Sequence, residues 1–116
     1  DGQTIAGTQM AAMFTSGLEQ VRTLTAAKVG DKTMIDALVP AVAAFQNAIE
    51  QNVSIPTALQ QAAASAAQGA EATKNMQARF GRARNLGDRT LGHADPGATS
   101  TALIFQGFSE SFTTTG

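Results

Sequence analysis

Apolar residues recur at intervals of three and four along most of the chain, and nowhere do apolar and polar residues alternate over a useful length. The first pattern is typical of amphipathic helices, whereas alternation would indicate half-buried strands. The sequence therefore predicts an all-α fold. We expect four helices, at about residues 6–26, 31–50, 55–76 and 98–112.

The second of these helices has the clearest apolar stripe, with large apolar side chains spaced by four, four, three and four residues at Met34, Leu38, Val42, Phe45 and Ile49. This spacing places them on one helix face, which we expect to be buried. A similar stripe is predicted for the first helix, formed by Met10, Phe14, Leu18, Val21 and Leu24. We expect that helix to end near Gly30, because Gly readily adopts the left-handed backbone of a helix cap.

The third helix is marked by its start and by its small side chains. Ser54 can accept hydrogen bonds from free backbone N–H groups, and Pro56 suits a first helical turn because that turn needs no donor from it. Eight alanines follow between Ala58 and Ala72. Such small side chains let neighbouring helices approach closely while helix propensity stays high. The pattern predicts a thin, central packing helix.

The stretch MQARFGRARNLGDRTLGHADPG lies between the third and fourth helices and is too Gly-rich and charged for a core element. It contains half of the Lys and Arg residues of the chain, namely Arg79, Arg82, Arg84 and Arg89. Guanidinium groups suit phosphate oxygens, and Gly lets a ligand approach the backbone closely. Arg also forms structural ion pairs, so residue types alone favour a loop pinned by carboxylates over a ligand site.

The sequence Asp95-Pro96-Gly97 has the composition of a helix start, with Asp as the capping residue and Pro near the first position. The same geometry directs free N–H groups and the positive end of the helix dipole toward an anion such as phosphate. Local pattern alone favours simple capping over ligand binding.

Three other polar residues have plain structural interpretations. His93, the only histidine, is interpreted as a hydrogen-bonded anchor in its loop. Asp31 and Asp36 are interpreted as a match to a helix dipole and a solvated position. With one His and no Cys, the chain has no spacing typical of a zinc site, and it contains no nucleophile elbow, Walker loop or Rossmann glycine pattern.

Composition narrows the class of protein further. The chain has 43% hydrophobic and 15% charged residues in 116 positions, which is typical of one globular domain. A net charge of -1 gives no global attraction to nucleic acid or an anionic membrane. No apolar run approaches a membrane span and no signal core precedes residue 10, so a soluble cytoplasmic protein is the expectation.

Two blocks, GDKTMIDALVPA and GRARNLGDRTLGHADPGATS, strongly resemble the ADP-binding (L) subunit of bacterial dihydroxyacetone kinases and the equivalent domain of the single-chain enzymes. MQARFGRAR continues the match upstream of the second block, and the resemblance covers essentially residues 1–116. It implies a barrel of eight antiparallel helices, of which this chain would form helices five to eight, the C-terminal half.

The resemblance also implies a nucleotide site for ADP or ATP. Met34 would lie against the adenine, Arg82 would meet phosphate or ribose, and the turn Asp95-Pro96-Gly97 would contact the nucleotide. Thr25 stands where the family usually has Gly, so its Cβ would narrow the pocket. The family's Mg²⁺ ligands are aspartates near its N-terminus, so no metal ligand is expected in this chain and the missing N-terminal half would supply them.

By resemblance, the activity would be that of a dihydroxyacetone kinase subunit that presents nucleotide phosphate to dihydroxyacetone held by a partner K subunit. The donor could be ATP, or bound ADP rephosphorylated by a phosphocarrier M subunit. This chain alone would be inactive, and its uncovered apolar faces would need a partner. The alternative is a non-catalytic helical interaction module, or an inactive fragment, that uses the Arg-rich loop. RNA binding is disfavoured because the chain has no Tyr or Trp for base stacking.

Overall fold

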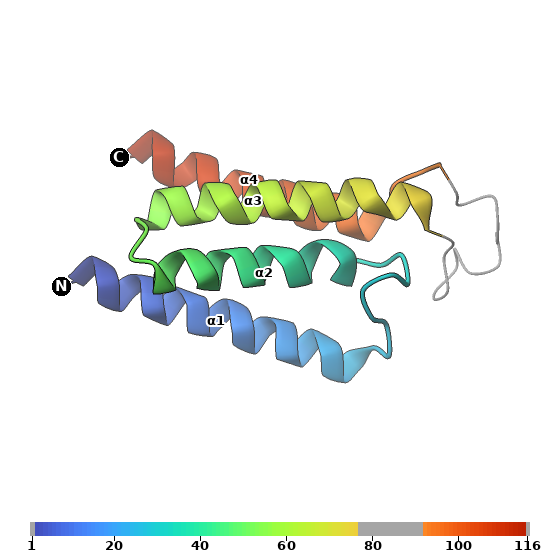
Figure 1. Ribbon diagram of the computed structural model, residues 1–116, viewed down its shortest axis with the longest axis horizontal. Coiled ribbons are helices and arrows are strands. Elements are labelled where there is room, and N and C mark those ends of the chain that lie inside the picture. Colours follow the sequence, from blue (N-terminus) through green and yellow to red (C-terminus); the bar gives the residue numbers. More distant parts are fainter. Residues whose placement is uncertain (1, 77–91, 116) are drawn as a thin grey trace.

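The computed structural model describes the backbone of residues 2–76 and 92–115, and the side chains of residues 5–76 and 92–111. These residues form four α-helices and one 3-10 turn, with no strand among them: α1 (Gly2–Leu24), α2 (Ile35–Glu50), α3 (Ile55–Ala72), η1 (Thr73–Asn75) and α4 (Pro96–Thr115). The prediction of an all-α fold with four helices is confirmed. Successive helices run in opposite directions, so the end of α1, the start of α2, the end of α3 and the start of α4 share one end of the bundle (Figure 1).

The third helix packs against both α2 and α4, and α2 in turn packs against all three other helices. Ser54 caps the third helix by accepting a hydrogen bond from the Thr57 backbone N–H at 3.4 Å. Its buried face consists mostly of alanines: Ala58, Ala62, Ala66 and Ala70 are buried, together with Ile55 and Leu59. Gly69 brings the backbones closest, since a Cβ there would lie 2.0 Å from the Asp36 carbonyl oxygen on α2.

A group of aromatic rings joins α1, α2 and α4 in the core. Phe45 of α2 is fully buried, and the Phe14 ring of α1 lies with its centroid 5.1 Å away in an edge-on arrangement. The same Phe14 ring lies 5.3 Å from that of Phe105 on α4. Edge-to-face and tilted ring pairs at these separations are favourable beyond the apolar area they bury. Leu59 of α3 belongs to the same core cluster.

Most of the predicted stripes face the core, with exceptions at the same end of the bundle. In α2, Val42 and Phe45 are buried, and Leu38 and Ile49 pack against the core, whereas Met34 lies one residue before the helix and is 37% exposed. In α1 the predicted stripe fails at Leu24, which is 87% exposed. The helix ends at that residue, and Gly30 (φ +101°) lies in the following loop instead of capping the helix as predicted.

Candidate functional site

The loop that leads into α2 is held in shape by a buried carboxylate. Asp36 is only 2% exposed, and its two oxygens accept hydrogen bonds from the backbone N–H groups of Gly30 at 2.6 Å and Thr33 at 2.9 Å. Interpreting Asp36 as a solvated residue is therefore wrong. A carboxylate in the first helical turn that accepts two backbone N–H groups fixes the loop that precedes the helix. The loop reaches Met34 in a defined conformation.

The start of α4 is fixed on the other side of the same bundle end. Asp95 caps the helix, because its Oδ2 accepts from the Ala98 backbone N–H at 2.9 Å. The Asp95 backbone N–H donates in turn to Thr73 Oγ1 at 2.8 Å. Thr73 is fully buried in the turn that ends α3. The capping role predicted for Asp95 is present, and a buried hydroxyl anchors the capping residue to the preceding helix.

These two helix starts meet at Met34 and Gly97. A Cβ added at Gly97 would lie 3.5 Å from Met34 Cβ, 3.6 Å from Met34 N and 3.1 Å from Asp95 Oδ2. Gly97 and Pro96 are exposed, and so is Met34, so this junction lies at the surface of the bundle end. Because Gly97 has no side chain, the start of α4 can approach the exposed Met34 closely. The two sequence blocks that carry the family resemblance thus contact each other in space.

A buried lysine joins the same two elements. Lys32 is 4% exposed and has a left-handed backbone with φ +62°. Its Nζ donates to the backbone carbonyls of Met76 at 3.2 Å and His93 at 2.5 Å. His93 does anchor the loop, but through its carbonyl oxygen, while its side chain is exposed. The ammonium therefore holds the α2 loop against the chain that enters α4.

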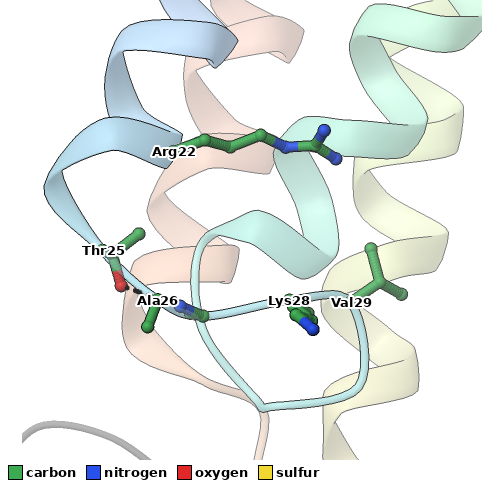
Figure 2. Close-up of a pocket in the computed structure, with 6 residues that line it drawn as sticks. Arg22, Thr25, Ala26, Lys28 and Val29 are labelled. Carbon is green, nitrogen blue, oxygen red and sulfur yellow. Dashed lines mark hydrogen bonds between the residues drawn. The ribbon is translucent and has the colours of Figure 1, made fainter.

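Thr25 lies in the loop after α1, at the same bundle end but in a separate hollow. It is half-buried, and its Oγ1 accepts from the Ala27 backbone N–H at 3.1 Å. The hollow has a volume of about 700 Å³, and its described lining residues are Arg22, Thr25, Ala26, Ala27, Lys28 and Val29. Figure 2 shows the Arg22 side chain extending from α1 toward α2, above the loop that carries Thr25 and Lys28. Two cationic side chains thus border this hollow.

The structure brings together four of the six residues that the sequence singled out, namely Met34, Asp95, Pro96 and Gly97. Thr25 lies in the loop after α1 and lines a separate hollow, whose described lining residues include none of these four. Arg82, together with Arg79, Arg84 and Arg89, lies outside the described residues.

Sequence reasoning missed two residues that shape the site, Lys32 and Thr73. Residue type gives no signal for either, because Lys is almost never fully buried and a Thr at a helix end is common. Their roles depend on contacts with residues distant in sequence. Asp36 had a detectable signal, since an Asp three residues after a Thr at a helix start can accept backbone N–H groups.

Two negative observations apply to the described part of the chain. Among those residues, no group of three His, Cys, Asp or Glu side chains is placed to hold a metal ion. No helix there combines the length and apolarity that crossing a bilayer requires. Both oxygens of Asp36 and one oxygen of Asp95 accept hydrogen bonds from backbone N–H groups.

The fold and this junction define an all-α domain with two helix starts placed side by side. The model of the DAK2 domain family matches residues 1–110, and the chain belongs to that family. The family resemblance drawn from the two sequence blocks is therefore confirmed.

Three relatives show what proteins the chain is similar to. It is 43% identical to the ADP-binding subunit DhaL of the PEP-dependent dihydroxyacetone kinase of Escherichia coli, over 90% of this chain and 50% of that protein. It is 35% identical to the ADP-binding subunit DhaL of PEP-dependent dihydroxyacetone kinase 1 of Listeria innocua, over 90% of this chain and 48% of that subunit. It is 39% identical to the mouse triokinase/FMN cyclase, over 90% of this chain and 18% of the enzyme. The chain thus spans about half the length of the bacterial subunits.

Proposed function

We propose that this chain is the C-terminal half of a nucleotide-binding domain in a cytoplasmic dihydroxyacetone kinase. Its role would be to bind ADP or ATP and present phosphate to dihydroxyacetone held on a partner K subunit. The observation that carries the proposal is the contact between Met34 and Gly97, within a family whose bacterial relatives are named ADP-binding subunits. A flexible thioether beside an open glycine suits the flat face of a purine.

Each site residue has a distinct task in this proposal. Met34 packs against adenine, and the turn at Asp95, Pro96 and Gly97 follows the nucleotide closely because Gly97 has no Cβ. Arg82 supplies charge toward phosphate or ribose, as guanidinium groups commonly do. Thr25 lines the neighbouring hollow and limits its width.

Both oxygens of Asp36 and one oxygen of Asp95 accept backbone N–H groups, and no group of three His, Cys, Asp or Glu side chains among the described residues is placed to hold a metal ion. We therefore assign the Mg²⁺ ligands to the preceding half of the domain. Phosphoryl transfer depends mainly on positioning and on neutralisation of phosphate charge. This half would supply nucleotide positioning, and a phosphocarrier M subunit would be the partner if bound ADP is rephosphorylated in place.

Calorimetric titration of the full-length protein with ADP and Mg²⁺ tests the proposal. Asp95→Ala removes the α4 cap and Arg82→Ala removes the matched arginine, and each should weaken ADP binding about tenfold or more. Lys74→Met is the matched control, because among the described residues the side chain of that half-buried lysine forms an ion pair only with Glu71. Undiminished affinity in both site variants would favour the competing identity, a helical interaction module without nucleotide.

A further inference from the structure

Lys32 is the least expected side chain at the junction. Lysine is seldom buried, yet this one is only 4% exposed. Its backbone has φ +62°, a conformation that L-residues other than Asn and Asp rarely adopt and that Gly would adopt freely. Backbone preference alone would therefore place Gly here. The side chain must contribute something that offsets both costs.

What the side chain contributes is a bridge across the bundle end. Its Nζ donates to the carbonyls of Met76, just after the 3-10 turn that ends α3, and of His93, just before the Asp95 cap. Met76 and His93 flank residues 77–91 in the sequence, so one ammonium holds together the two points from which that segment departs and returns. The Gly92 backbone N–H donates to the Lys74 carbonyl at 2.6 Å and reinforces the same closure.

The bridge completes a short ring of contacts around the candidate site. From Lys32 the ring passes through the His93 carbonyl to Asp95 and Gly97. It returns to Met34, two residues after Lys32, whose Cβ would lie 3.5 Å from a Cβ added at Gly97. Because Lys32 and Met34 are so close in the chain, fixing the ammonium on His93 also fixes where Met34 stands relative to Gly97. Hydrogen bonds from a charged donor are stronger than those between neutral groups, which suits this role.

We infer that Lys32 is a positioning residue, which sets the spacing between Met34 and Gly97 without itself contacting the ligand. The part of this inference that concerns nucleotide affinity rests on the proposed function, whereas the part that concerns spacing does not. A merely stabilising lysine would change the free energy of unfolding and leave the spacing of the folded protein as it is. If Lys32 instead bound phosphate directly, removing its side chain would weaken the binding of ADP and leave the binding of adenosine unchanged.

Cross-linking tests the spacing directly. The Cβ separation of 3.5 Å falls within the range that a disulfide requires, and the chain has no Cys of its own. The double variant Met34→Cys/Gly97→Cys should therefore close a disulfide, and glutathione redox titration gives the effective concentration of the two thiols. Adding Lys32→Met, which keeps most of the length of the side chain but removes its donors, should lower that effective concentration about tenfold.

Lys74→Met is the control for this series. It removes a neighbouring lysine whose ammonium pairs with Glu71 at 2.8 Å on the surface, and it should leave the effective concentration within about twofold. If Lys32→Met does not fold, Lys32→Gly makes the same comparison, because Gly suits the left-handed backbone. Equal cross-linking with and without the Lys32 side chain would overturn the inference, as would failure of the double variant to cross-link at all.

Ligand binding separates positioning from direct contact. In the full-length protein, Lys32→Met should lower the affinities for adenosine and for ADP by the same factor, about tenfold. The reason is that the substitution acts through the positions of Met34 and Gly97. A loss confined to ADP would overturn the positioning role and identify Lys32 as a phosphate contact. If the unaltered protein binds neither ligand, the proposed function fails, while the cross-linking series still decides whether Lys32 sets the spacing.

Discussion

Met34 and Gly97 come from opposite halves of the chain, yet a Cβ on Gly97 would lie only 3.5 Å from the Cβ of Met34. The contact exists because α2 and α4 both begin at the same end of an antiparallel bundle (Figure 1). Asp36 fixes the loop before one helix, and Asp95 caps the other. Two sequence blocks that look independent along the chain therefore form one surface.

That surface predicts a specific effect of adding one methyl group. Gly97→Ala would place a Cβ 3.1 Å from Asp95 Oδ2 and 3.5 Å from Met34 Cβ, and the added methyl group would fill the space between Gly97 and Met34. We expect ADP affinity in the full-length protein to fall about tenfold, equivalent to about 1.4 kcal/mol. Isothermal titration calorimetry measures the change.

Gly107→Ala is the matched control for this substitution. It lies in the same helix, and a Cβ there meets no atom within 4 Å. Ala favours the helix interior by up to about 1 kcal/mol over Gly, so this variant should keep ADP affinity and melt slightly higher. Equal affinity of the two variants would show that ligand does not approach Gly97.

Replacing the buried carboxylate of Asp36 by an amide of the same size should destabilise the protein. Asp36→Asn keeps the size of the side chain but leaves one acceptor oxygen for two backbone donors, the N–H groups of Gly30 and Thr33. An unsatisfied buried donor costs about 1–3 kcal/mol, and we expect the free energy of unfolding to fall by that amount in urea titrations. Glu19→Gln makes the same chemical change on an exposed position of α1 and should stay within about 0.5 kcal/mol. Similar values for both variants would mean that Asp36 does not hold the loop.

The sequence predicted the helices well because their apolar spacing depends only on neighbouring residues. It predicted the burial of Val42 and Phe45, and it identified Asp95 as a cap. It failed for Leu24, where a residue in register with the stripe falls at the last position of α1. Register predicts a face, but burial also requires a neighbouring helix that extends as far.

The candidate site was only partly accessible from the sequence. Family resemblance singled out Met34 and Gly97, and the pattern of residues did not show that they touch. The burial of Lys32 and Thr73 depends on partners far along the chain, Met76 and His93 for the lysine and Asp95 for the threonine. Long-range hydrogen bonds to backbone carbonyls leave no periodic signal, since every residue carries the same carbonyl group.

The close approach of α3 to α2 at Gly69 predicts that adding a methyl group there and at Gly17 has opposite effects on stability. Gly69→Ala would put a Cβ 2.0 Å from the Asp36 carbonyl oxygen and 3.1 Å from the Ala37 Cα, and both of these are backbone atoms that cannot rotate away. Forcing α2 and α3 apart should cost about 1–3 kcal/mol of unfolding free energy, as overpacked cores do. Gly17→Ala has open space around its Cβ in the interior of α1 and should instead stabilise by about 0.5–1 kcal/mol. Urea midpoints that move in the same direction would contradict this packing.

We expect the exposed apolar residues of α1 and α4 to be covered by a further half of the domain. Met13 of α1 is 72% exposed, and Leu103 and Ile104 of α4 are 62% and 57% exposed. Adjacent exposed side chains of this size favour association. We expect the isolated 116-residue chain to self-associate in sedimentation velocity runs, and Leu103→Ser/Ile104→Ser to reduce that association.

In the full-length protein the same double substitution should lower the melting temperature, because the preceding half would then lose its apolar contact. A monodisperse isolated chain, combined with an unchanged melting temperature in the full-length variant, would show that these side chains are not an internal interface.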